Sequence, residues 1–241
     1  MYKTIIFLIP FLIYFLGCAA VPVYRVNSLD KNTDLYMGLE TVNKDDSTAS
    51  VSLQFQKQSG ENYIFSISIK NNSQQQFAVD PKNIYTKIVQ GNVSNKNNYF
   101  RALDPEKQLI NIDKDINNTS AQQKTANGLF FLTSVVNLAS DIATIGKQKS
   151  QEEVEETQYD REVQRQENID ENNYYDNKIS SLKDKKEYWE HNIFRVSIFY
   201  PGDEIGGILV LPIVPDAQII DIVVPVNNKE YNFIYKQTCI D

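Results

Sequence analysis

Histidine and cysteine, which often act as catalytic bases and nucleophiles, are almost absent from this chain of 241 residues. The single histidine, His191, would have to serve any Ser-His-Asp triad. It ends a charged segment predicted to be helical, where a cationic ring suits the helix dipole. Cys239 follows an apolar strand and is expected to pack in the core or at an edge, with an intermolecular disulfide as the alternative. These residues predict neither a catalytic site nor a side-chain zinc site.

Carboxylates are dense in one short segment, and paired carboxylates can perform acid-base chemistry. The run consists of Glu152, Glu153, Glu155, Glu156 and Asp160. On a polar helix these side chains point in several directions and no apolar pocket surrounds them, so a solvated face is expected. No calcium-binding loop is present, and the glycines of 202–207 match no phosphate-binding loop. We therefore expect no enzyme activity, no metal and no cofactor.

Cys18 is the residue whose setting predicts a specific modification. Lys3 precedes an apolar run over 4–16, which suits a signal peptide and is too short to span a membrane. The sequence Phe15-Leu16-Gly17-Cys18 resembles the lipobox of bacterial lipoproteins, with Phe where Leu is usual. This resemblance implies cleavage before Cys18, acylation of its thiol and, usually, of the new amine. An ordinary signal peptide cut after Ala20 is the alternative.

The lipobox resemblance also predicts a location in the bacterial cell envelope. Ala19 stands where Asp marks inner-membrane retention in enterobacterial lipoproteins, which favours an outer-membrane anchor facing the periplasm. The membrane and the leaflet stay open on this evidence. The net charge is −7 and becomes −8 without Lys3, so the chain has no broad attraction for nucleic acid. The expected partners are the membrane, through the lipid, and an envelope protein.

Hydropathy and charge divide the chain into five segments. Residues 63–70 alternate apolar and polar side chains, which predicts a strand, and turn residues separate several such runs. Helix-forming residues interrupt this series, an insertion that closure entropy tolerates. The fold class is therefore mainly β with an α insertion (α+β), an antiparallel sandwich interrupted by a helical hairpin or arm. The segments are a signal peptide at 1–17, a lipidated Cys and tether at 18–48, sandwich halves at 49–118 and 193–241, and the helical insertion at 119–192.

Two strand-turn-strand segments resemble immunoglobulin-like domains of bacterial envelope lipoproteins. Ile67-Ser68-Ile69-Lys70-Asn71-Asn72-Ser73, followed by Phe77-Ala78-Val79-Asp80-Pro81, is similar to the opening of such a domain. The segment from Phe194-Arg195 through Tyr200-Pro201-Gly202 to Gly206-Gly207 is similar to the closing half. The resemblance covers about half the chain and implies an immunoglobulin-like fold in the envelope, without implying an activity.

The most informative pattern lies at 129–145, which is mostly apolar. Its polar residues recur on one stripe of a helix, which leaves a wide apolar face. They are Thr133, Asn137, Ser140, Asp141 and Thr144. We expect this face to pack against the sandwich or the later helix. The alternative is contact with a partner or a membrane surface, whereas Asn137 and Asp141 would be costly in a membrane span.

The second half of the insertion is acidic at first and then recovers helical spacing. Residues 147–173 predict an exposed helix or a flexible arm. Further on, Tyr175, Ile179, Leu182 and Trp189 predict a helix that docks on another element. The pairs Tyr174-Tyr175 and Tyr188-Trp189 are candidate partner contacts, with core packing as the alternative. Separately, Asp46-Ser47-Thr48 resembles the acceptor of some periplasmic O-glycosylation systems.

These patterns favour a noncatalytic, membrane-anchored envelope protein that acts as a scaffold and recruits a partner through the insertion. The alternative is a binding module for a lipid or glycan, held in a groove between helices and sandwich. Exposed apolar residues on the insertion would favour the scaffold. A concave pocket lined by aromatic residues would favour the ligand. The oligomeric state stays open.

Overall fold

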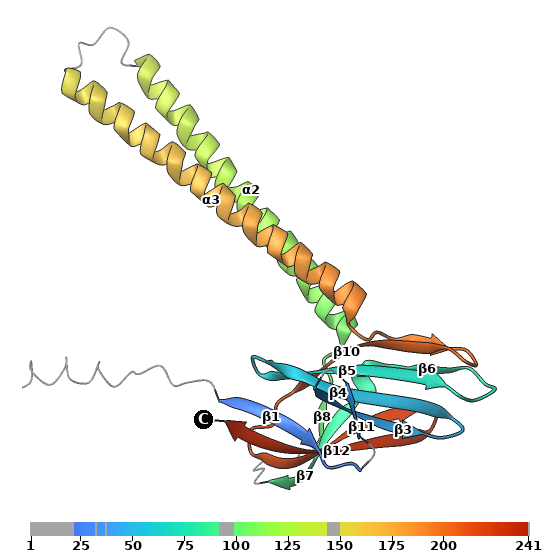
Figure 1. Ribbon diagram of the computed structural model, residues 1–241. Helices are drawn as coiled ribbons and strands as arrows, with labels where there is room; N and C mark the ends of the chain where they lie inside the picture. The colour runs from blue at the N-terminus through green and yellow to red at the C-terminus, as the bar shows by residue number, and fades with distance from the viewer. Residues whose placement is uncertain (1–21, 32, 37, 92–98, 144–149, 241) are drawn as a thin grey trace, which may run out of the picture.

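A computed structural model describes residues 22–31, 33–36, 38–91, 99–143 and 150–240 (Figure 1). These residues form antiparallel sheets and one long helical hairpin. One five-stranded sheet has the order β1 (Val23–Ser28), β12 (Lys229–Ile240), β11 (Ala217–Val226), β7 (Tyr85–Gly91) and β8 (Tyr99–Arg101). The other has the order β10 (Glu204–Pro212), β5 (Asn62–Asn71), β4 (Ala49–Ser59), β3 (Leu39–Asp45) and β2 (Thr33–Tyr36). A separate ribbon joins β6 (Phe77–Val79) to β9 (Ser197–Phe199).

Alternating apolar residues cause the two large sheets to pack face to face. In β5, buried residues alternate with half-buried polar ones, as the sequence predicted. The ring of Phe65 lies 5.4 Å from that of Tyr235 on β12, centroid to centroid. Tyr63 donates a hydrogen bond of 2.6 Å across the same interface to the Gln237 side chain. The buried polar groups of Tyr63 and Gln237 are thus paired, and the two sheets share one hydrophobic core.

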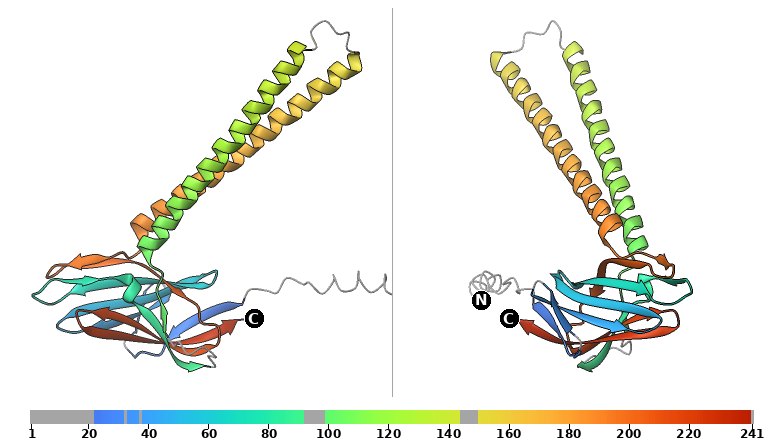
Figure 2. Two further views of the ribbon diagram at one scale, coloured as in Figure 1. Left: turned by 180° about the vertical axis from the view of Figure 1, so that it is seen from behind. Right: turned by 45° about the vertical axis from the view of Figure 1, so that its right-hand side comes forward.

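The helical hairpin leaves this body between β8 and β9. It consists of α2 (Pro105–Ala143) and α3 (Gln151–Asn192), which run side by side and project away from the sheets (Figures 1 and 2). Asp104 begins α2, since its carboxylate accepts the backbone N–H groups of Glu106 and Lys107 at 3.0 and 3.2 Å. At a rise of 1.5 Å per residue, α2 is about 58 Å long.

Residues 18–48 are not the tether that the sequence predicted. Of these, the described residues form β1, β2 and β3, which are hydrogen-bonded members of the two large sheets. The composition misled because each strand contributes little to the core: Val26 and Val42 are buried among exposed or half-buried neighbours. Backbone pairing, which polar sequences also support, holds these strands in place.

The helical insertion also begins earlier than predicted, at Pro105 instead of residue 119. The segment 109–112, which the sequence assigned to the first sandwich half, forms the second turn of α2, where Leu109 and Ile112 are buried at the base of the hairpin. Their spacing of three residues suits a helix as well as a short strand. The Asp104-Pro105 pair, an N-cap followed by proline at the first helical position, is the sequence feature that marks the true start.

Candidate interaction surface on the helical hairpin

The two helices of the hairpin meet along a seam with coiled-coil spacing. The residues of α2 that recur at the buried or half-buried positions are three and four apart, as in a heptad pattern. They are Leu109, Ile112, Ile116, Thr119, Gln123, Ala126, Phe130 and Asn137. On α3 the same spacing joins Asn168, Asn172, Tyr175, Ile179, Leu182, Lys186 and Trp189. The prediction that the end of the insertion docks on another element is confirmed, and that element is α2.

The seam changes character along its length. Near the sheets it is apolar, with one ion pair at its border: Lys186 Nζ lies 2.7 Å from Asp113 Oδ1. Farther out, polar side chains face each other across the seam. Gln123 donates to Asp176 at 2.8 Å and Asn137 donates to Gln164 at 3.3 Å. The distal half of the hairpin is therefore held by side-chain hydrogen bonds that contribute only about 0.5–1.5 kcal/mol each.

The apolar residues of the distal half of α2 lie on its outside. Leu129, Phe131, Leu132, Val136 and Leu138 are 60–66% exposed, and Val135 is 46% exposed. We call these six residues the α2 outer face. No Asp, Glu, Lys or Arg occurs from residue 125 to residue 140. Because monomeric proteins seldom expose contiguous apolar patches of more than a few hundred Å², this face indicates an interaction site.

The expected packing of this apolar face against the body or the later helix is wrong for the described residues. The narrow polar stripe faces α3 instead, as the hydrogen bond from Asn137 to Gln164 shows. Phe130 is the one large apolar side chain of this stretch that turns toward the seam and becomes half-buried. The reason is the partner helix: α3 presents polar side chains here, and they pair with the stripe better than with leucine or valine.

The neighbouring half of α3 carries most of the charge of the molecule. Residues 151–176 contain ten acidic and two basic side chains, a net of −8, whereas the whole chain has −7. The predicted acidic run, from Glu152 to Asp160, is fully exposed, as expected for a solvated face. Ser150 and Glu153 form a capping box at the start of this helix. The hairpin thus combines an uncharged apolar side on α2 with an acidic helix.

The four aromatic residues proposed as partner contacts divide between the seam and the surface. Tyr175 and Trp189 are half-buried in the seam, whereas Tyr174 and Tyr188 are exposed. The centroids of the Tyr174 and Tyr175 rings lie 5.5 Å apart, and Lys178 Nζ lies 5.7 Å from the centroid of the Tyr174 ring. These residues belong to α3 and none is part of the α2 outer face. Sequence reasoning had identified the apolar face of α2 but expected it to pack inward, because spacing alone does not say on which side of α2 the second helix lies.

The remaining candidates for chemistry are not gathered into one site. His191 is exposed in the last turn of α3, and Cys239 is exposed on β12, opposite Tyr24 of the edge strand β1. Across the described residues, no group of three or more His, Cys, Asp and Glu side chains could hold a metal ion. Cys18 and the segment 1–17 lie outside the described residues.

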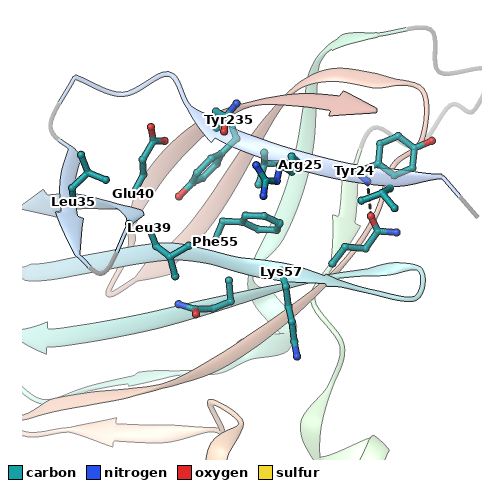
Figure 3. Close-up of a pocket in the computed structure, with 14 residues that line it drawn as sticks. Tyr24, Arg25, Leu35, Leu39, Glu40, Phe55, Lys57 and Tyr235 are labelled. Atoms are coloured by element: carbon teal, nitrogen blue, oxygen red, sulfur yellow. Dashed lines mark hydrogen bonds between the residues drawn. The ribbon is translucent and has the colours of Figure 1, made fainter. Parts of the chain in front are cut away.

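A hollow of about 480 Å³ opens between the edge strand β1 and the strands β3 and β4 (Figure 3). Tyr24, Phe55 and Tyr235 are its aromatic lining residues, and its charged lining residues are Arg25, Lys57 and Glu40. It lies between the two sheets and is lined by no helical residue. Shallow grooves on the hairpin are lined by helical residues alone. None of these hollows is therefore the groove between helices and sandwich that the sequence predicted.

Asp46 has a strongly perturbed carboxyl group, and its role is to hold a turn. Its side chain accepts the backbone N–H groups of Thr48 and Ala49 at 2.6 and 3.1 Å. It also pairs with Lys229 Nζ at 3.0 Å and accepts the Tyr231 hydroxyl at 2.9 Å. Burial acts to raise the pKa of Asp46, but these hydrogen bonds outweigh it and lower the pKa well below its usual value. The adjacent Ser47 is exposed, and its glycosylation stays a prediction.

Comparisons of the chain with protein-family models, curated proteins and solved structures found no match. Among the described helices, none contains a stretch long and apolar enough to cross a membrane. Function therefore has to be argued from the surfaces of the molecule itself. Of these, the α2 outer face departs furthest from the usual arrangement of polar residues outside and apolar residues inside.

Proposed function

We propose that this protein is a noncatalytic, lipid-anchored envelope protein whose hairpin binds another protein chain through the α2 outer face. The observation that carries the proposal is the inverted distal half of the hairpin, in which polar side chains such as Asn137 and Gln164 meet in the seam while most of the leucines and valines, and Phe131, face solvent. Burying apolar surface contributes about 25 cal/mol per Å², so covering this face supplies a driving force for association.

The body suits the role of an anchored platform with an immunoglobulin-like sandwich fold. In such sandwiches strands A, B and E lie together in one sheet and C, F and G in the other. Here β4, β5 and β10 are neighbours in one sheet, and β7, β11 and β12 are neighbours in the other. This agreement of strand order supports the fold class. It leaves β1, β2 and β3 as additions at the sheet edges.

The anchor proposed at Cys18 would keep the body close to a membrane. β1 begins at Val23, five residues after Cys18, and five extended residues reach at most about 18 Å. A diacylated or triacylated cysteine holds a protein firmly, at about 0.8 kcal/mol per buried methylene. We place the anchor in the outer membrane, facing the periplasm, because Ala19 follows the cysteine. In this position the hairpin, about 58 Å long, extends the reach of the protein.

A photoreactive side chain at Val136 tests this function in cells that lipidate the full chain. The matched control carries the same group at Gln166, an exposed position on α3. The proposal predicts discrete protein adducts from Val136 upon irradiation and few from Gln166. Adducts with lipid alone, or equal protein adducts from both positions, would contradict it. Fractionation and circular dichroism confirm that both variants are anchored and folded.

The alternative function, binding of a lipid or glycan, is favoured by one observation. The hollow at β1 combines aromatic walls with Arg25 and Lys57, groups that suit a sugar ring or an anionic headgroup. Phe55→Ala should weaken such binding by at least about tenfold, since an aromatic wall is lost. Glycan arrays and lipid-vesicle binding with the full protein and this variant test it. Equal binding by both would exclude the hollow as the site.

A further inference from the structure

A second line of residues with coiled-coil spacing runs along α2 on the side opposite α3 and includes Leu132 and Val135 of the α2 outer face. Gly128, Leu132, Val135 and Ala139 are spaced by four, three and four residues, and all four are exposed. Each of these four residues lies two positions after a residue on the side of α2 that faces α3. Two positions correspond to about 200° of helical rotation, so the four residues lie on the opposite side of the helix. A lipid surface requires no such 3.5-residue period, whereas a partner helix does. The expected occupant is therefore helical.

The charges of the hairpin indicate which helix this is. The α2 outer face carries no charged side chain, so it cannot recognise a charged partner by electrostatic complementarity. A basic partner would instead be attracted to α3, with its net charge of −8 over 151–176. The acidic helix also opposes insertion beside anionic headgroups. An uncharged face that meets a copy of itself suffers no like-charge repulsion, which suits a twofold interface.

The exposed area matches what a pair of chains needs. The six side chains are 46–66% exposed and together present at most roughly 600 Å² per copy, the upper end of the apolar patches that monomers expose. Two copies would bury about 1,200 Å², the lower limit of specific interfaces. Helices in contact lie 8–10 Å apart. In the order α3, α2, α2, α3, the two acidic helices are thus separated by about 25 Å, well beyond the Debye length of about 8 Å.

We infer that two copies of this chain associate in parallel through their α2 outer faces, forming a row of four helices with the two α2 helices in the middle and an α3 helix at each end. This inference rests on the proposed function, since lipid anchors in one membrane give both copies the same orientation and bring the two faces to the same height. In a parallel pair, equivalent seam residues face each other across the twofold axis. Leu132 of one copy therefore lies beside Leu132 of the second.

Disulfide formation at position 132 tests this arrangement. The full lipidated chain carries Leu132→Cys and Cys239→Ser, so that the exposed Cys239 cannot contribute. Two differently tagged copies are expressed together and oxidised in intact cells. The Cα atoms of a disulfide must lie within about 7 Å, which a parallel seam allows. The control carries Gln166→Cys on α3, and a second seam variant carries Val135→Cys.

The inference predicts a covalent pair that contains both tags, formed at least tenfold faster by Leu132→Cys or Val135→Cys than by Gln166→Cys. Adding Val136→Asp to Leu132→Cys should abolish it. A disulfide to a different protein would overturn the second copy as occupant and leave the proposed function standing. Lack of any covalent pair from either seam position would overturn the inference, whereas the proposed function is decided separately by the photoreactive group at Val136. Equal rates at Gln166→Cys would overturn the parallel seam and indicate random collision.

Discussion

The body and the distal half of the hairpin arrange polar and apolar side chains in opposite ways. In the body, Phe65 and Tyr235 are almost completely buried between the sheets, and polar side chains alternate outward. In the distal hairpin, Asn137 and Gln164 meet in the seam while Phe131 faces solvent. The body thus has its core within one chain. The distal hairpin lacks one among its described residues, and we propose that another chain covers its apolar surface.

The two halves of the hairpin repeat this contrast on a smaller scale. Near the sheets, Leu109 and Ile112 are buried, and Arg195 holds both carboxylate oxygens of Glu106 at 2.8 and 2.7 Å. Beyond Gln123 the seam becomes polar. The proximal half is therefore part of the folded unit, whereas the distal half is helical without an apolar core of its own. Helices of this kind gain most of their stability from tertiary packing.

The largest effect should follow from Phe65→Ala in the body. The ring is fully buried and contacts the rings of Phe55, Tyr63 and Tyr235. Its removal should lower the free energy of unfolding by about 3–5 kcal/mol, measured by urea unfolding of the full protein in mild detergent. A loss below about 1 kcal/mol would show that the two sheets do not form the core described above.

A smaller effect is expected for Asp46→Asn, which weakens the turn between β3 and β4. The loss should be about 1–3 kcal/mol at neutral pH, since several hydrogen bonds to a carboxylate weaken. The folded-state pKa of Asp46 lies below its usual 3.8, so its contribution to stability is complete above about pH 5 and declines as the pH falls toward the folded value. Unfolding measured from pH 7 to pH 2 should accordingly show a shallower acid loss in the variant. Identical slopes would exclude this role.

Arg195→Gln should have a still smaller effect, because the pair with Glu106 is partly exposed. Such pairs contribute about 0.2–1 kcal/mol, and salt screens them. The measurement is urea unfolding at low and high salt, with Glu106→Gln as the matched partner. If the double variant loses as much unfolding free energy as the two single variants together, Arg195 and Glu106 do not interact and the pair does not couple the hairpin to the body.

The smallest effect on unfolding should follow from Phe131→Ala on the hairpin, the counterpart of Phe65→Ala. Phe131 is 66% exposed, so its removal from a single chain should change the free energy of unfolding by less than about 0.5 kcal/mol. The same variant should weaken association at least tenfold, measured by energy transfer between labelled chains in vesicles. A large loss in the free energy of unfolding, measured in dilute protein where chains do not associate, would show that Phe131 packs within its own chain.

Sequence reasoning predicted the strands whose side chains alternate, such as Tyr63 to Ile69, because period two determines which face is buried. It missed β1 to β3, whose stability comes from backbone pairing with strands distant in sequence. It identified the two faces of the helix after Leu129, but it assigned the wrong face to the interior. The polar heptad positions Asn168 and Asn172 of α3 are the feature that could have corrected it, because they match the polar stripe of α2.

Thiol labelling of Val135→Cys in vesicles tests most directly whether the α2 outer face is an interface. The full lipidated protein, with Cys239→Ser, is anchored at high and low surface density and treated with a membrane-impermeant maleimide. Our account predicts that crowding slows labelling at Val135→Cys at least tenfold, while Gln166→Cys reacts equally fast at both densities. Rapid labelling of Val135→Cys at every density, equal to that of Gln166→Cys, would contradict it.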